Sequence, residues 1–137
     1  MERITRLLGY RVEESKFRLR PIKPNEKFSL SPRFSCTIKG GAQNFTAILT
    51  VVLGEEVSPA PTPFDLKASL SGNFTLGEDV GDDKEKQLRF AVETLFPYLR
   101  AYVSTHTALC GVPPFILPHI DVDAMASAMK SENTVYN

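Results

Sequence analysis

Four segments of the chain alternate apolar and polar residues, and all four precede a long segment whose apolar residues repeat at helical spacing. Alternation with a period of two predicts strands with one buried face, because successive side chains of a strand point to opposite sides of a sheet. The connections between the segments are short enough for hairpins, which predicts an antiparallel meander. The four predicted strands span residues 4–20, 28–39, 45–53 and 64–74.

Two of these segments carry a signal for their place in the sheet. Pro32 falls in the apolar register of the second segment, and proline cannot donate to a strand ladder, so it indicates an edge strand or a bulge. Ile48 and Val52 add apolar side chains to the second face of the third segment, which predicts a central strand partly covered on both faces.

The helical spacing belongs to a segment that starts near Lys84, where Asp83 is a suitable N-cap. Pro97 lies inside it and removes one backbone hydrogen bond at a cost of about 3 kcal/mol, so we expect a kink or a restart near Thr94. Gly111 is suited to end this helix, because glycine tolerates the left-handed conformation found after a helix C-terminus. The apolar positions that define the spacing are Leu88, Val92, Leu95, Leu99 and Tyr102.

Together these segments predict an α+β fold, in which a long kinked helix packs on one face of a four-stranded antiparallel sheet and a short second helix follows. The second helix is expected over residues 124–130, with Asp121 or Asp123 as its cap. The composition fits one domain, because 137 residues with 42% hydrophobic and 23% charged side chains can bury a core without cross-links. We place that domain at residues 1–130 and expect residues 131–137 to be a flexible tail.

The second half of the long helix lacks the charged face that a helix on the surface of a small domain normally turns to water. After Arg100, the next charged residue is Asp121 when histidine is counted as neutral. A helix without a charged face is usually covered on both sides, and a second subunit is the natural cover. We therefore predict a homo-oligomer, with an interface that includes Leu99, Ala101, Tyr102, Thr105 and Ala108.

The net charge is zero but unevenly distributed. Residues 1–40 hold ten Lys or Arg and four Asp or Glu, whereas the rest of the chain holds six and twelve. The basic half has the composition of a nucleic-acid footprint, but its charges alternate with apolar residues, which favours a solvated sheet face and no nucleic-acid partner. Two cysteines and no apolar run at the N-terminus predict the cytoplasm, and no uninterrupted apolar segment of the sequence is long enough for a membrane helix.

His106 and Cys110 are four residues apart on one side of the helix, a spacing that raises a metal site or a nucleophile as alternatives to packing. A metal site needs more than these two ligands, and a cysteine at a helix C-terminus lies where the helix dipole disfavours the thiolate. No glycine-rich phosphate loop or nucleophile elbow is present in the sequence. We therefore expect neither an enzyme nor a bound metal or cofactor.

Several short motifs in the second half of the chain occur in a fixed order and spacing. They are Leu95-Phe96-Pro97-Tyr98-Leu99-Arg100, Cys110-Gly111-Val112-Pro113-Pro114, Leu117-Pro118 and Asp123-Ala124, preceded by the segment 64–74 with its Ser71-Gly72-Asn73-Phe74 ending. In these motifs the chain resembles SecB, the family of cytoplasmic holdase chaperones of bacterial protein export. The resemblance implies a SecB-like fold, a tetramer built as a dimer of dimers, and ATP-independent binding of unfolded polypeptides.

Apolar residues crowd the segment 112–122, whose prolines prevent a regular element. The residues alone favour a clamp that holds the helix on the sheet, whereas the resemblance implies a groove for extended, unfolded peptide around this loop and the second helix. Such a groove needs apolar walls without fixed polar geometry, because its clients vary in sequence. The candidate groove residues are Phe28, Leu30, Phe74, Val112, Phe115, Ile116, Ile120 and Val122.

Three functions remain open: a holdase for unfolded preproteins, a dedicated chaperone for one client such as the antitoxin of a toxin–antitoxin system, and an oligomeric scaffold with the SecB-like fold but no chaperone activity. SecB proteins that serve export are acidic and carry an Asp-x-Ser-Phe-Glu type motif in the first strand, near the docking site of SecA. This chain is neutral, and its nearest counterpart is Glu13-Glu14-Ser15-Lys16-Phe17. We therefore predict weak or absent binding of SecA.

Overall fold

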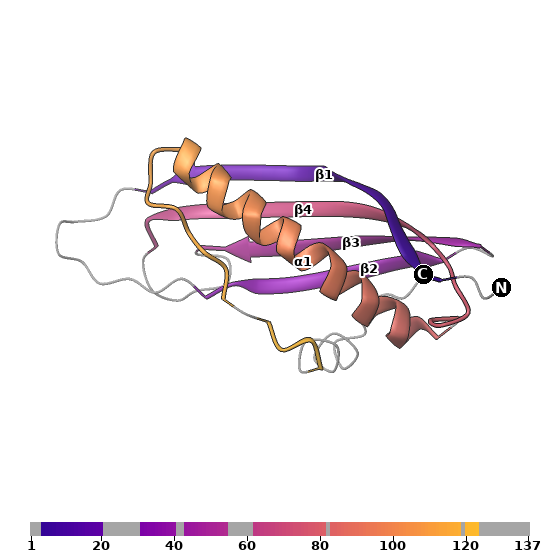
Figure 1. The fold of residues 1–137 in the computed structure, drawn as a ribbon. Helices are drawn as coiled ribbons and strands as arrows, with labels where there is room; N and C mark the ends of the chain where they lie inside the picture. The colour runs from indigo at the N-terminus through magenta and orange to yellow at the C-terminus, as the bar shows by residue number, and fades with distance from the viewer. Residues whose placement is uncertain are drawn as a thin grey trace.

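Four strands and one long helix make up the described part of the chain in the computed structural model, which covers residues 4–20, 31–40, 43–54, 62–81, 83–118 and 120–123. The strands are β1 (Arg6–Leu19), β2 (Arg33–Gly40), β3 (Asn44–Leu53) and β4 (Phe64–Thr75), and the helix is α1 (Lys84–Leu109). Figure 1 shows a single sheet with α1 running diagonally across one of its faces. The described residues therefore form two layers, a sheet and a helix.

The strands are antiparallel and lie in the order β1-β4-β3-β2. The predicted α+β fold with a four-stranded antiparallel sheet is confirmed, and β2, β3 and β4 form the predicted meander. The meander is wrong for β1, which pairs with β4 and not with β2. Residues 20–32 connect β1 to β2, and a connection of that length does not force its two strands into a hairpin.

The two signals for position in the sheet are confirmed. β3 is a central strand, and its residues Ile48 and Val52 are half-buried on the face away from the helix. β2 is an edge strand that begins at Arg33, directly after Pro32, so the proline does not interrupt the ladder. The predicted strand residues 28–30 lie outside the described residues.

The core lies between the sheet and α1. Every second residue of β3 and β4 faces the helix, and register pairs such as Leu49 with Leu70 form apolar rows across the sheet. Phe45 and Phe74 stack in one of these rows, with ring centroids 4.8 Å apart. From α1 the buried apolar residues are Leu88, Ala91, Val92, Leu95, Leu99 and Val103, which recur at the three- and four-residue intervals of a helix with one apolar side.

Both ends of α1 are capped as predicted. The Asp83 side chain accepts hydrogen bonds from the backbone N–H groups two and three residues later, at 3.0 and 3.3 Å. Gly111 has a φ of +88°, and its N–H group and that of the next residue donate to the carbonyls of Ala108 and Thr107. This pair of bonds is the Schellman motif, which turns the chain back at the end of a helix.

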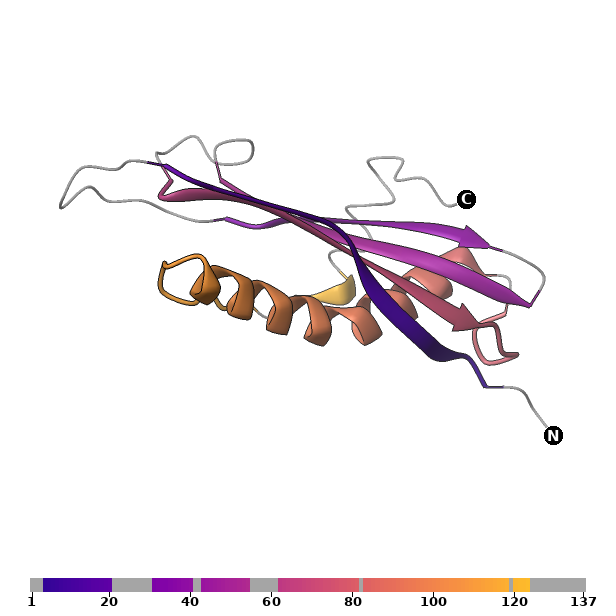
Figure 2. The same cartoon turned by 90° about the horizontal axis from the view of Figure 1, so that it is seen from above.

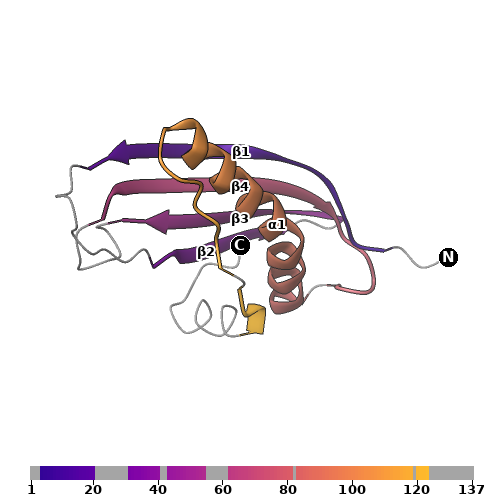
Figure 3. The same ribbon diagram turned by 60° about the vertical axis from the view of Figure 1, so that its left-hand side comes forward.

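Pro97 lies within α1, and the helix continues through it, so of the two alternatives expected near Thr94 the restart does not occur. The expected kink is present as a bend near the middle of the helix, with its convex side away from the sheet (Figures 2 and 3). Pro97 is exposed, so the carbonyl group that loses its hydrogen-bond partner there can face water. The predicted second helix, residues 124–130, and the predicted tail, residues 131–137, lie outside the described residues.

Candidate functional site

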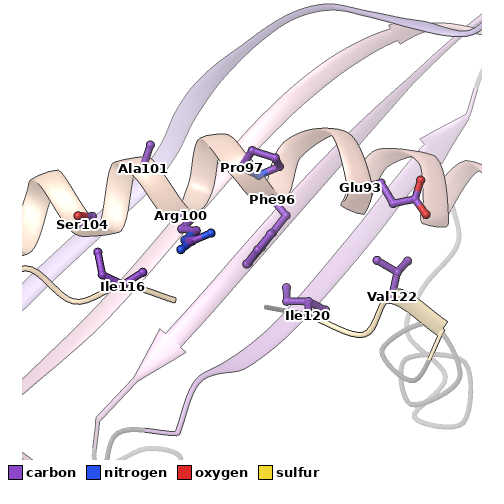
Figure 4. Close-up of a pocket in the computed structure, with 9 residues that line it drawn as sticks. All are labelled: Glu93, Phe96, Pro97, Arg100, Ala101, Ser104, Ile116, Ile120 and Val122. Atoms are coloured by element: carbon purple, nitrogen blue, oxygen red, sulfur yellow. The ribbon is translucent and has the colours of Figure 1, made fainter. Parts of the chain in front are cut away.

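An open groove runs along α1, between the helix and the segment that follows it, residues 112–123. Its volume is about 510 Å³. In Figure 4 the helix forms one wall and residues 116–122 form the other, and the two walls run side by side. The lining residues are Glu93, Phe96, Pro97, Arg100, Ala101 and Ser104 from α1, and Ile116, Ile120 and Val122 from the segment.

The helical wall arises from a single stripe of α1. Its lining positions are three, four, seven, eight and eleven residues after Glu93, which places them on one side of a helix with 3.6 residues per turn. Phe96 anchors this stripe, because its ring also packs edge-on against Phe34 of β2, with centroids 6.0 Å apart. The sheet therefore holds this wall in place.

The second wall is an extended segment whose start is fixed by α1 and the core. The backbone N–H of Phe115 donates to Thr107 Oγ1 at 2.9 Å, and Leu117 is buried with 1% of its surface exposed. Three prolines between residues 113 and 118 lack a backbone donor, which keeps the segment from forming a regular element. Since Leu117 lies in the core, its neighbour Ile116 is left 52% exposed on the groove side.

At its far end the second wall is tied back to α1 by charge. Asp123 forms an ion pair with Arg89, which also pairs with Glu85 one turn earlier at 3.2 Å. Asp121 accepts a hydrogen bond from the Asp123 N–H at 3.0 Å, as a capping residue does at the start of a helix. The segment is thus fastened to α1 on both sides of its groove-lining residues.

The segment 112–122 contains both residues that clamp the helix onto the sheet and residues that border the groove. Ile116, Ile120 and Val122 line the groove. Val112 and Phe115 are half-buried and pack against the core instead. Consecutive residues differ in this way because an extended backbone turns successive side chains to opposite sides.

Phe74 does not belong to a groove wall, and its assignment to one is wrong. It is fully buried under α1, where its ring stacks on Phe45 and meets Phe90 edge-on, with centroids 5.8 Å apart. The helix therefore covers this aromatic row of the sheet. The remaining predicted groove residues, Phe28 and Leu30, lie outside the described residues.

The prediction missed most of the helical wall of the groove. Phe96 and Arg100 lie within the motif that carries the SecB resemblance, but the groove was predicted from the apolar residues of the following loop, and these do not indicate which helix residues line it. The spacing of residues along the helix is the signal that could have found them. Glu93, Pro97, Arg100 and Ser104 recur every three or four residues, on a side of the helix that Leu95 does not share.

The predicted oligomer interface divides between two sides of α1. Leu99 is fully buried in the core of the protomer, so its assignment to an interface is wrong: it follows Leu95 by four residues on the side that faces the sheet. Tyr102 is half-buried, and its hydroxyl donates to Ser15 Oγ of β1 at 2.7 Å. The positions that are exposed on the other side are Ala101, Thr105 and Ala108.

The reactive side chains outside the groove take part in packing. Burial raises the pKa of Cys36 to about 12, so this thiol stays protonated at neutral pH. His106 stacks on Tyr102 with centroids 5.4 Å apart and meets Phe17 edge-on at 5.8 Å. Among the described residues, no group of three or more His, Cys, Asp or Glu side chains is placed to hold a metal ion. No helix in the described part of the chain has both the length and the apolar character to span a bilayer.

No family model matches the chain. The chain is similar to the uncharacterized protein MJ0357 of Methanocaldococcus jannaschii, with 34% identity over 137 residues, covering 92% of this chain and 86% of that protein. Its structure is similar to that of the Mycobacterium tuberculosis SecB-like chaperone Rv1957, solved in complex with a ChAD peptide from the Rv1956 HigA1 antitoxin. That match has a TM-score of 0.66 and 16% sequence identity, and it covers 85% of this chain and 90% of that chain. The SecB-like fold implied by the sequence motifs is therefore confirmed.

Proposed function

The chain belongs to the same family as the uncharacterized protein MJ0357 of Methanocaldococcus jannaschii, and from its SecB-like fold and the groove along α1 we propose that it is an ATP-independent chaperone. Its site is the groove between α1 and residues 116–122, which holds segments of non-native polypeptide. The groove itself carries the proposal: it is an open, largely apolar channel on a fold shared with a chaperone that binds a peptide. Catalysis forms no part of this function.

Apolar side chains from both walls make up most of the groove lining, and they offer contact without fixed hydrogen-bond geometry. A site of this kind accepts an extended peptide through its apolar side chains and tolerates variation between them. A volume of about 510 Å³ accommodates a few side chains rather than a folded surface. Captured side chains are removed from water, so they no longer drive the association of one non-native chain with another.

A client-specific role is the form of this function that we favour. The Rv1957 structure contains a peptide from an antitoxin, which supports a chaperone that serves one partner. A general holdase for unfolded preproteins in export is the second candidate. A scaffold with this fold and no chaperone activity is the remaining alternative, and it predicts that no client occupies the groove.

Coupling to SecA is weak or absent in this proposal, because β1 presents basic side chains on the face away from α1. Register pairs Lys16 of β1 with Lys67 of β4 on that face, and it pairs Arg11 with Ser71. Glu14 lies on the same face, and a hydrogen bond from Lys67 lowers the pKa of its carboxyl group. Basic side chains outnumber acidic ones among these residues. Such a surface has little electrostatic attraction for a partner that docks on an acidic strand.

The assembly that we propose is a cytoplasmic homo-oligomer in the SecB-like arrangement, a dimer of dimers. Its support is an uncharged strip on the exposed side of α1, formed by Thr105, Ala108 and Leu109, whereas Ala101 belongs to the groove wall. Leu109 is 81% exposed in the protomer. An uncharged strip that ends in an exposed leucine is the kind of surface that subunit contacts cover.

Two neighbouring residues of the second wall test the chaperone proposal. Ile116→Ser should reduce the suppression of aggregation of chemically denatured citrate synthase, followed by light scattering. Its free energy of unfolding should stay within about 0.5 kcal/mol of the wild-type value, because the side chain is 52% exposed. Leu117→Ser is the matched control: the same kind of change at a core position should cost about 2–5 kcal/mol in urea denaturation.

If the wild type, at several-fold excess, does not slow the aggregation of any denatured substrate, the general-holdase form is excluded. If it also binds no peptide, the client-specific form is excluded as well and the scaffold alternative stands. A loss of stability in Ile116→Ser as large as that in Leu117→Ser would show that Ile116 belongs to the clamp and not to the groove.

A further inference from the structure

Two opposite charges stand in the wall of the otherwise largely apolar groove. Glu93 and Arg100 are both exposed, and both line it. Within the described part of the chain, neither side chain makes an ion pair. Arg89, four residues before Glu93, differs, because Glu85 and Asp123 neutralise it. The charges of Glu93 and Arg100 are therefore open to a ligand in the groove.

The separation of these charges suits an extended peptide. Arg100 follows Glu93 by seven residues, so the two lie about 10 Å apart along the axis of α1. An extended chain advances about 3.3 Å per residue and returns to the same side every second residue, so three successive side chains on one side span about 13 Å. The outer two can reach the two charges through flexible side chains. The middle one then lies by Phe96, opposite Ile120 (Figure 4).

On the basis of the proposed chaperone function, we propose that the groove selects a peptide in which a basic and an acidic residue lie two positions to either side of an apolar residue, in either order along the peptide. The basic side chain pairs with Glu93 and the acidic side chain pairs with Arg100. The apolar side chain packs between Phe96 and the second wall. Client choice then depends on the signs of two charges as well as on hydrophobicity, which allows the chaperone to distinguish one partner from other unfolded chains.

A second copy of the chain fits this groove less well than such a peptide. The exposed side of α1 carries no charged residue after Arg100 up to the helix end at Leu109. An uncharged surface laid over the groove would remove Glu93 and Arg100 from water without pairing them, which is unfavourable for both charges. A peptide that carries both signs of charge satisfies them.

Binding of synthetic nine-residue peptides to the full chain tests the proposal, measured by titration calorimetry at low salt. All peptides have a central Leu in a Ser background, and the residues two positions to either side are Lys and Glu, Lys and Lys, Glu and Glu, or Gln and Gln. The wild type should bind the Lys/Glu peptide about tenfold more tightly than either like-charged peptide, because a like charge replaces an attraction with a repulsion. The Gln/Gln peptide measures the apolar contact alone.

Single charge reversals should change the ranking of the peptides. Arg100→Glu gives the groove two acidic side chains and should favour the Lys/Lys peptide, whereas Glu93→Lys should favour the Glu/Glu peptide. Arg33→Glu and Glu78→Lys are matched controls, because they make the same changes in net charge at positions that do not line the groove. Both controls should keep the wild-type ranking, and far-UV circular dichroism should show all variants to be folded.

The outcomes separate this inference from the function on which it rests. Unchanged rankings in both reversal variants, with the Gln/Gln peptide still bound, would overturn the charge requirement and leave the groove as a peptide site. If the wild type binds none of the peptides, the inference is overturned. If it also does not suppress aggregation, the proposed function is overturned as well. A change in oligomer mass in the reversal variants without a change in ranking would assign the groove to a second copy and overturn the inference.

Discussion

After Arg100 the two sides of α1 are equally free of charge, yet they lie in different environments. The side that faces the sheet buries Leu99 and Val103 completely. The opposite side leaves Ala101, Thr105 and Ala108 exposed. The absence of charge therefore indicates that a helix surface can be buried at little cost. It does not indicate whether the same chain, a client or another subunit buries it.

Side-chain size separates the two sides. Burial of a leucine or valine contributes about 1.5–3 kcal/mol, so the large residues at positions 95, 99 and 103 hold α1 on the sheet. Alanine contributes little when it is buried, but its small side chain lets another chain approach the helix backbone closely. The buried side thus stabilises the protomer, and the exposed side remains available for binding.

The largest effect is expected from Leu99→Ala. Loss of a fully buried leucine leaves a cavity and should lower the free energy of unfolding by about 2–5 kcal/mol, measured by urea denaturation. Leu109→Ala is the matched control on the same helix, and it should change that value by less than about 0.5 kcal/mol, because Leu109 is 81% exposed. A comparable loss at Leu109 would break the comparison, since the exposed side would then also hold the protomer together.

A charge on the exposed side should act on assembly and leave folding intact. Ala108→Lys should dissociate the proposed oligomer, because an unpaired charge buried between subunits costs on the order of several kcal/mol. Light scattering at micromolar concentration gives the mass, and circular dichroism reports the fold. Ala108→Ser, which is neutral and small, should keep the wild-type mass. A wild type that is monomeric under these conditions would contradict an interface on this side.

The smallest effect is expected at Tyr102, which lies at the border between the two sides. Tyr102→Phe removes the hydrogen bond to Ser15 but keeps the ring that stacks on His106, so the free energy of unfolding should fall by about 0.5–1.5 kcal/mol. In a double-mutant cycle with Ser15→Ala, the double variant should lose no more than the larger single loss. Fully additive losses would show that the two groups are not coupled.

The groove could be predicted only in part from the sequence. The segment 112–122 shows its apolar residues and prolines directly, so a region of apolar contact was predictable there. Ile116 and Leu117 have the same character and are adjacent, yet one lines the groove and the other lies in the core. The hydrogen bond from the Phe115 N–H to Thr107 helps to set the start of this segment, and no pattern in the segment records a bond to a residue eight positions earlier.

By itself the sequence determined the four strands and the long helix of this protein, and the two ends of that helix. The signals for these elements act over a few residues, so they can be recognised in the sequence alone. They are the alternation of the strands, the helical spacing, the Asp83 cap and the Gly111 stop. Only the tertiary structure decided that β1 lies beside β4, that Phe74 lies beneath the helix, and that Glu93 and Arg100 line one groove with Ile116. Each of these depends on contacts between segments far apart in sequence, and the free energy of such contacts is set by the packing of the whole fold.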